Sequence, residues 1–380
     1  MSTKKTALSF GWLFALCTAH GQSSYEVLVN SRGTNAVFRY DAEGNWLGEF
    51  IASGSGGLVG PEDVLFHPDG TVLVTGFGNT AIKRYDGSTG DYLGDFSTGY
   101  DLEVPSKMSI GPDSLLYVTQ WGTTQNKVVR FDLDGVFVDE FTEVATPNGL
   151  GHFWDDQGRF YISVYGNGAN GFVRRFTAGG EDLGVFINST VLQGPTDLWQ
   201  EENGDVLVQD WTTGTVLRYD STGAYVGVFV SGLTNPEGLT FLPDGDLLMG
   251  DWGVDAVHRI SPDGAVLGYF ASGNGLTDPN GVFLRAVPTI GIDEDGTGQM
   301  RILASPAVGP GPFEIRGLPM GTTAFTVLDA TGRTVDAMIG SPGISATLSW
   351  EPGSSFRAGV YRIVVRSEGR TAGTSVVLVR

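Results

Sequence analysis

A short strand ending in phenylalanine recurs six times in this chain, and this repeat limits the possible fold more than any other feature. Its copies begin at Trp46, Tyr92, Phe137, Asp182, Tyr225 and Val266 and end at Phe50, Phe96, Phe141, Phe186, Phe229 and Phe270. The period is therefore 41 to 46 residues, which is typical of repeat architectures. Because the chain also holds 57 glycines, we expect many tight turns between short strands.

Each repeat contains three further strands, of which two precede the phenylalanine strand, as at residues 206–209 and 216–219. The third follows a proline turn at Pro61, Pro105, Pro147, Pro195, Pro236 and Pro279. One four-stranded sheet cannot bury both faces, so the sheets should stack around an axis. The repeats begin with three strands (26–50) and end with a single strand (281–286). The sequence therefore predicts an all-β fold: a six-bladed β-propeller over residues 22–287, with four strands per blade, closed by the last inner strand joining the first blade.

These repeats resemble those of the NHL-repeat propellers and of the related gluconolactonase/regucalcin-like and virginiamycin-lyase-like six-bladed families. The resemblance rests on the proline turns, on Pro-Asp-Gly hairpins at 68–70 and 243–245, and on an Asn-to-Arg run that begins at Asn35, Asn79 and Asn126. It implies the propeller fold. It leaves the activity open, because propellers carry many unrelated functions.

The N-terminus predicts export. Residues 1–21 have the layout of a secretory signal peptide, with two lysines, an apolar run and then small residues. The one cysteine, Cys17, lies in this segment, so the mature chain should contain no disulfide and no thiolate. The net charge of −20 argues against nucleic acid and anionic membranes as partners. No later apolar stretch is long enough for a transmembrane segment, and we expect a monomer.

A second pattern of strands follows the repeats. Residues 288–304 form an acidic, glycine-rich linker, and residues 305–380 predict a small β-sandwich. The segments 327–335, 348–350, 358–365 and 375–380 resemble the type A sorting domain of the type IX secretion system. This resemblance implies export by the type IX secretion machinery, with a secreted or outer-surface location. Residues 305–309 lack the Pro-Asn-Pro with which the sorting family opens, which affects where the domain starts but not its identity. A fibronectin-like or cell-wall adhesion module is the alternative.

Polar side chains follow all six turn prolines, at the position where inner strands are expected to point into a central tunnel. These residues are Glu62, Ser106, Asn148, Thr196, Glu237 and Asn280. Closure of the ring would make Glu237, Asn280 and Glu62 neighbours, and their oxygens suit Ca²⁺ or another hard divalent cation. The gluconolactonase/regucalcin-like resemblance implies metal-ligand roles for Glu62 and Asn148, with Asp197 one residue out of register. The alternative is that these residues only shape turns and hydrate the tunnel.

Aromatic residues follow the second strand in five repeats. They are Phe77, Trp121, Tyr165, Trp211 and Trp252. Such rings can stack on sugars or other ligands, so the last four are candidate ligand-binding residues, as is Lys107, the second residue after a turn proline. The alternative is that the rings pack blades together. Asp210 and Asp251 precede two of the tryptophans, and we expect them to accept hydrogen bonds from loop N–H groups.

Three functions are compatible with this pattern, and no catalytic residue is assigned. The leading interpretation is a secreted or cell-surface propeller that binds an extracellular small molecule, glycan or peptide, with a cation in the tunnel as an option. The second is a metal-dependent lactone hydrolase that uses Glu62, Asn148 and either Asp197 or Glu237. The third is a structural or adhesion protein. The sequence contains no phosphate loop, dinucleotide fingerprint or nucleophile elbow, which argues against nucleotide-driven chemistry.

Overall fold

The computed structural model describes residues 25–166, 171–286, 303–305, 308–316, 323–328, 334–340, 347–353, 356–357, 359–367 and 370–378. The predicted signal peptide lies outside these ranges, and so does the predicted linker except for residues 303 and 304. None of the helices in the described ranges is long and apolar enough to cross a membrane.

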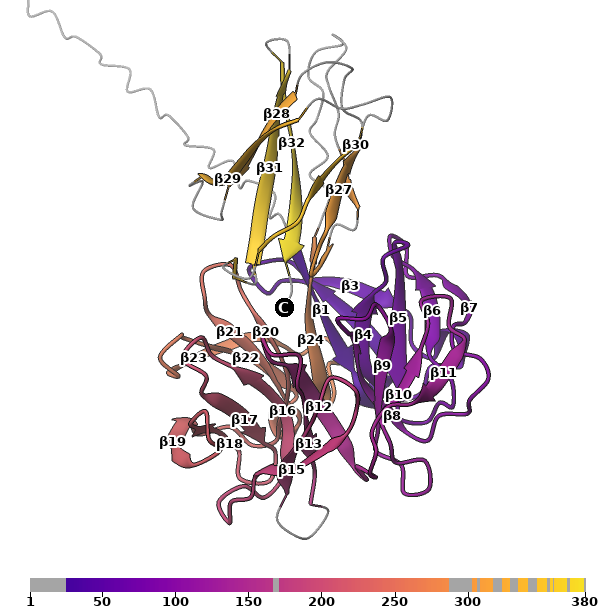
Figure 1. Cartoon of the computed structure of the whole chain (residues 1–380), viewed down its shortest axis with the longest axis vertical. Helices are drawn as coiled ribbons and strands as arrows, with labels where there is room; N and C mark the ends of the chain where they lie inside the picture. The colour runs from indigo at the N-terminus through magenta and orange to yellow at the C-terminus, as the bar shows by residue number, and fades with distance from the viewer. Residues whose placement is uncertain are drawn as a thin grey trace, which may run out of the picture.

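Six four-stranded antiparallel sheets make up the described part of residues 25–286 (Figure 1). The innermost strands are β4 (Pro61–Phe66), β8 (Pro105–Ile110), β12 (Gly149–Trp154), β16 (Pro195–Gln200), β20 (Pro236–Phe241) and β24 (Pro279–Ala286). The second strands are β5 (Thr71–Gly76), β9 (Leu116–Gln120), β13 (Phe160–Val164), β17 (Val206–Asp210), β21 (Leu247–Asp251) and β1 (Tyr25–Ser31). Three short 3₁₀ helices, η1 (Arg32–Thr34), η2 (Ser55–Gly57) and η3 (Trp252–Val254), lie in the connecting loops.

Two outer strands complete each sheet. The third strands are β6 (Lys83–Asp86), β10 (Val129–Phe131), β14 (Phe172–Phe176), β18 (Thr215–Tyr219), β22 (Ala256–Ile260) and β2 (Ala36–Tyr40). The outermost strands are β7 (Tyr92–Asp95), β11 (Phe137–Glu140), β15 (Asp182–Ile187), β19 (Tyr225–Val230), β23 (Val266–Ser272) and β3 (Trp46–Ile51). The predictions of an all-β chain and of repeated four-stranded sheets are confirmed, and the arrangement is consistent with a propeller.

The first sheet is made from both ends of the repeat region. Strand β24 pairs antiparallel with β1, with Val27 opposite Leu284, so the sheet order is β24-β1-β2-β3. Each inner strand contacts the next one, from β4 through β8, β12, β16 and β20 to β24, and β24 contacts β4. Apolar residues alternate along these strands and fill the space between neighbouring sheets.

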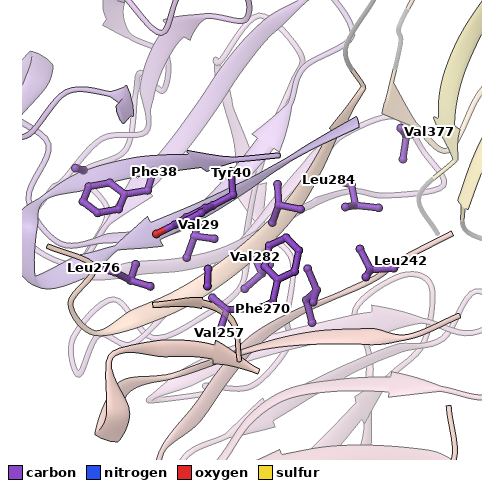
Figure 2. Close-up of a cluster of buried hydrophobic side chains, with 14 of the residues drawn as sticks. Val29, Phe38, Tyr40, Leu242, Val257, Phe270, Leu276, Val282, Leu284 and Val377 are labelled. Atoms are coloured by element: carbon purple, nitrogen blue, oxygen red, sulfur yellow. The ribbon is translucent and has the colours of Figure 1, made fainter. Parts of the chain in front are cut away.

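One buried cluster illustrates how adjacent sheets pack. Val29 and Phe38 from the first sheet meet Val257 and Phe270 from the β20–β23 sheet, with Val282 of β24 between them (Figure 2). Burying each such side chain stabilises the fold by roughly 1.5–3 kcal/mol. The chain ends of the repeat region are therefore held by packing as well as by strand pairing.

Two further sheets contain the described C-terminal residues. One has the order β25 (Leu303–Ser305), β27 (Phe313–Arg316), β30 (Thr347–Trp350). The other has the order β26 (Val308–Gly309), β32 (Arg370–Leu378), β31 (Gly359–Ser367), β28 (Thr323–Leu328), β29 (Thr334–Gly340). Phe313 and Trp350 of the first sheet share a buried cluster with Val327 and Ile363 of the second. Val377 of β32 packs near Leu284 in the cluster of Figure 2, so the C-terminal sheets contact the repeat region.

Candidate functional site

The loops that follow the second strands are fixed in the same way in five sheets. The backbone N–H of Phe77 donates to the carbonyl of Gly60 (2.7 Å), and that of Trp121 donates to the carbonyl of Val104 (2.9 Å). The same bond joins Tyr165 to Asn148 (3.1 Å), Trp211 to Gly194 (2.8 Å) and Trp252 to Asn235 (3.1 Å). Each bond ties the start of the loop to the residue just before the inner strand. The five aromatic residues therefore lie at equivalent positions.

Four of these five aromatic rings contact one another in sequence. The ring centroids of Trp121 and Tyr165 are 5.1 Å apart, those of Tyr165 and Trp211 are 6.3 Å apart, and those of Trp211 and Trp252 are 6.1 Å apart. The last two pairs meet edge to face, a favoured geometry for aromatic pairs. The structure thus brings together the four aromatic residues that the sequence analysis named.

Arg32 occupies the sixth position of this arrangement, which the sequence analysis missed. Its guanidinium carbon lies 4.4 Å from the ring centroid of Phe77 and 4.7 Å from that of Trp252, within the range of cation–π attraction. Arg32 follows β1 just as the aromatic residues follow the second strands of the other sheets. Aligning the repeats in the sequence places Arg32 at the same position as the five aromatic residues, provided that residues other than aromatic ones are considered. We call these six residues the collar: Arg32, Phe77, Trp121, Tyr165, Trp211 and Trp252.

The collar surrounds a pocket of about 290 Å³. The remaining lining residues, which we call the floor, are Glu62, Ser106, Leu150, Thr196 and Glu237. Each floor residue is the second residue of an inner strand. The volume lies at the lower end of the range for small-molecule pockets.

Asn148 lies outside this floor although it follows a turn proline. Strand pairing sets Gly149 opposite Val164, just as Pro236 is opposite Asp251, so Leu150 is the counterpart of Glu237. Asn148 corresponds instead to the residue before the strand and has a left-handed φ of 58°, which asparagine tolerates better than most residues. Its side-chain amide donates to the carbonyl of Trp121 (3.2 Å). Pro147 lies two residues before Gly149, the first residue of β12, whereas the other inner strands begin at their proline. Asn148 therefore supports the collar.

A β-bulge brings a second layer of side chains into the interior. The register shifts just after the start of the inner strand, for example between Pro61 and Asp63 and between Pro195 and Leu198. A bulge breaks the strict alternation of side chains, so the residue after the floor position also turns inward. Asp63, Lys107 and Asp197 occupy this layer. Asp63 was not among the residues named from the sequence.

Lys107 lies at the centre of the inner layer. Its ammonium donates to the backbone carbonyls of Asn280 (2.8 Å) and Glu62 (3.1 Å). It also lies 3.5 Å from Glu237 Oε1 and 3.7 Å from Asp197 Oδ2. Lys107 is only 6 % exposed and lies beneath the pocket lining. The structure therefore places this candidate ligand-binding residue among oxygens of the protein itself.

Glu62 connects the two layers. Its carboxylate accepts hydrogen bonds from Arg32 Nε (2.7 Å) and from Asn280 Nδ2 (2.9 Å). Asn280 is fully buried, and its Oδ1 has no hydrogen-bond partner among the described residues. The structure thus brings Glu62, Glu237, Asn280 and Asp197 together around Lys107, whereas Asn148 lies apart.

Burial governs the protonation of these acids. It raises the pKa of Glu237 to about 8, although Lys107 opposes the shift, and it raises the pKa of Asp63 to about 7 against the same opposition. Burial also raises the pKa of Glu62, with Arg32 opposing. For Lys107, burial disfavours the charge, but the surrounding carboxylates outweigh it and raise the pKa. The Lys107 ammonium thus remains charged, whereas some of the buried acids around it hold protons.

The residues present do not fit a divalent cation in this interior. The space between the carboxylates of Glu237 and Asp197 is taken by the Lys107 ammonium. Across the described ranges, no group of three or more His, Cys, Asp or Glu side chains is arranged to hold a metal ion.

Asp210 and Asp251 hold the loops of the collar, as the sequence predicted. Asp251 accepts hydrogen bonds from the backbone N–H groups of Thr234 (2.8 Å), Asn235 (2.9 Å) and Gly253 (3.1 Å). Asp210 accepts hydrogen bonds from the corresponding backbone of residues 193, 194, 212 and 213. The capping roles are confirmed, and they fix the positions of Trp211 and Trp252.

The sheets and the pocket define an all-β protein of the propeller type with a ligand-sized cavity above its inner strands. No protein-family model matches the chain, and no curated protein matches it in sequence.

Solved structures match the fold. One is a nidogen/laminin complex, with 15 % identity, a TM-score of 0.57 and coverage of 69 % of this chain and 98 % of the other. Another is a protein of unknown function from Bacteroides caccae, with 16 % identity, a TM-score of 0.54 and coverage of 69 % and 99 %. The calcium-binding protein regucalcin from Agrobacterium tumefaciens has 17 % identity, a TM-score of 0.44 and coverage of 58 % and 76 %. At these identities the first two matches show a similar fold and nothing more.

Proposed function

We propose that this protein binds a saccharide or a similar uncharged polyhydroxylated ring in the pocket within the collar. The observation that carries the proposal is the pairing of aromatic faces with buried polar atoms that make no hydrogen bond, although Glu237 Oε1 also lies 3.5 Å from the Lys107 ammonium. Among the described residues, the indole Nε1 of Trp252 and Oε1 of Glu237 are buried without a hydrogen bond, and both residues line the pocket. A sugar offers apolar ring faces for stacking and hydroxyls for such atoms.

The charges around the floor favour an uncharged ligand. The carboxylate of Glu62 is paired with Arg32, and the Lys107 ammonium is shared by Glu237 and Asp197. Each charged side chain that lines the pocket, Arg32, Glu62 and Glu237, thus has an opposite charge of the protein beside it, so the pocket offers no unpaired charge to select an ionic group. A peptide, the other ligand in the leading sequence interpretation, would rely more on backbone pairing and charge.

The proposal is tested by calorimetric titration of the protein with neutral mono- and oligosaccharides and, separately, with a panel of peptides. We expect saccharide binding that Trp211→Ala weakens by about tenfold or more, because a stacking surface is lost. The matched control is Trp46→Ala, since Trp46 is 45 % exposed on the outermost strand β3. Equal affinities for the two variants, or binding of peptides and not of saccharides, would refute the proposal.

We also propose the finer features of the fold and its export. The six sheets form a closed six-bladed propeller, supported by the pairing of β24 with β1. The two C-terminal sheets form a β-sandwich, supported by their shared buried cluster. This domain directs the protein, a monomer, through the type IX secretion machinery. The protein is then secreted or held at the outer surface of the cell. Deleting residues 305–380 should then leave the protein in the periplasm, and normal export of the shortened chain would contradict the sorting role.

The metal-dependent hydrolase is not proposed as the function. It requires Glu62, Asn148 and Asp197 or Glu237 to share one metal, whereas Asn148 supports the collar and Lys107 lies between the other two carboxylates.

A further inference from the structure

The Lys107 ammonium is enclosed by oxygen atoms from four different inner strands. They are the backbone carbonyls of Glu62 on β4 and Asn280 on β24, and the carboxylates of Glu237 on β20 and Asp197 on β16. We call these four groups the oxygen cage. Carbonyl and carboxylate oxygens are the donors that a hard cation such as Ca²⁺ prefers.

The dimensions of the cage suit an ammonium. The four oxygens lie 2.8, 3.1, 3.5 and 3.7 Å from Nζ, whereas Ca²⁺ binds its oxygens at about 2.3–2.6 Å. The two carbonyls are fixed by the backbone, but the carboxylates stand on flexible side chains. Without the lysine, the carboxylates could move inward by about 1 Å and meet a metal ion.

The cage is also costly to leave empty. Glu237 is 5 % exposed and Asn280 is fully buried, so their oxygens have little access to bulk water. Buried carboxylates need a cation or a proton. Lys107 supplies a positive charge here from the protein's own β8, in addition to the protons that raised pKa values let the acids hold.

We propose that the Lys107 ammonium takes the place of a metal ion in this interior, so that the protein binds no divalent cation there but would bind one if the lysine were removed. Glu62 and Glu237 also line the pocket, but the test of this inference uses metal alone, so its failure is distinguishable from failure of the saccharide proposal.

The test follows the thermal unfolding midpoint of the full chain with and without millimolar Mn²⁺ or Ca²⁺. We expect Lys107→Ala to gain about 3 °C or more over the response of the wild type, since a ligand that binds only the native state raises the midpoint. The gain should vanish when Glu237→Gln is added. The matched control, Lys127→Ala, removes the lysine of a half-exposed pair with Glu140 and should respond like the wild type.

Two results would overturn the inference. One is a folded Lys107→Ala protein whose metal response equals that of the wild type, because the oxygens would then not form a cation cage. The other is a metal-induced rise in the wild type that Glu237→Gln abolishes, because a metal would then bind beside the lysine. The second measurement needs no lysine variant, so it remains decisive if Lys107→Ala does not fold.

Discussion

Replacing Lys107 by methionine removes the internal cation while keeping most of the side-chain volume. The substitution leaves two buried carbonyls without their donor and deprives Glu237 and Asp197 of the ammonium 3.5 and 3.7 Å away. Removing one partner of a buried ion pair costs about 3–5 kcal/mol, because the other charge stays buried without compensation. We therefore expect a large loss of stability for Lys107→Met.

The loss should depend on pH. Burial raises the pKa of Glu237 to about 8 and that of Asp63 to about 7, so at pH 5.5 both acids hold protons and Lys107 has less negative charge to offset. The remaining cost is then that of the unpaired carbonyls, about 1–3 kcal/mol. At pH 8.5 these acids are largely ionised in the wild type and Lys107 stabilises their charge; in Lys107→Met they must carry that charge without it or retain a proton, so the cost rises towards about 3–5 kcal/mol.

Thermal unfolding followed by tryptophan fluorescence measures this difference. For a domain of this size each kcal/mol shifts the midpoint by about 2 °C. Lys107→Met should thus lower the midpoint by about 6–10 °C at pH 8.5 and by about 2–6 °C at pH 5.5. The control is Lys127→Met, because Lys127 pairs with Glu140 near the surface, where such pairs contribute about 0–1 kcal/mol. The reasoning fails if both variants lose equally, or if the loss for Lys107→Met does not grow with pH.

Three further substitutions test the acid, the loops and the close packing. Glu237 has a folded pKa of about 8 against 4.5 for the free group, so the wild type loses stability as pH rises from about 4.5 to 8. Glu237→Gln should therefore flatten the midpoint–pH curve and gain stability over the wild type through that window, by at most about 5 kcal/mol at pH 9, since each pKa unit corresponds to about 1.4 kcal/mol; parallel curves would contradict this. Asp251→Ala should lower the urea midpoint by the equivalent of about 2–3 kcal/mol, because three loop N–H groups lose their acceptor; a neutral result would deny its capping role. A Cβ on Gly151 would lie 2.5 Å from Asp197 Oδ1, so Gly151→Ala should cost about 1–3 kcal/mol, whereas Gly227→Ala, with no atom within 4 Å, should stay within about 0.5 kcal/mol.

The sheets were predictable because strand periodicity and turn residues are local signals. Alternating apolar residues give the strands, and glycine or proline marks where each one ends. Pairing of the last strand with the first also follows from the sequence, since residues 26–50 lack a fourth strand and residues 281–286 supply one; the structure has β24 beside β1. Six repetitions of one pattern made each of these local readings more reliable than a single copy would be.

The collar was predictable in five of its six members for the same reason. Alignment of the repeats finds these residues because they follow their strands at equivalent positions: Phe77, Trp121, Tyr165, Trp211 and Trp252. Arg32 was not predicted because it is not an aromatic residue. Its guanidinium nevertheless packs against Phe77 and Trp252, as an aromatic ring would at this position. Charged residues at a repeat position otherwise occupied by rings are therefore worth reading as members of the same set.

The interior was only partly predictable, because its content depends on register and not on composition. A bulge carries no mark in the sequence, yet it turns Lys107, Asp63 and Asp197 inward. A proline two residues early likewise moves Asn148 from the expected floor to the turn, and Leu150 takes its place. Of the side-chain oxygens assigned to a metal from the sequence, those of Glu237 and Asp197 face one point, but a neighbouring strand places an ammonium there; Glu62 and Asn280 contribute backbone carbonyls instead. Since an acidic ring accepts either kind of cation, its ligand can be identified only when every residue that enters the ring is known, and here that residue is Lys107.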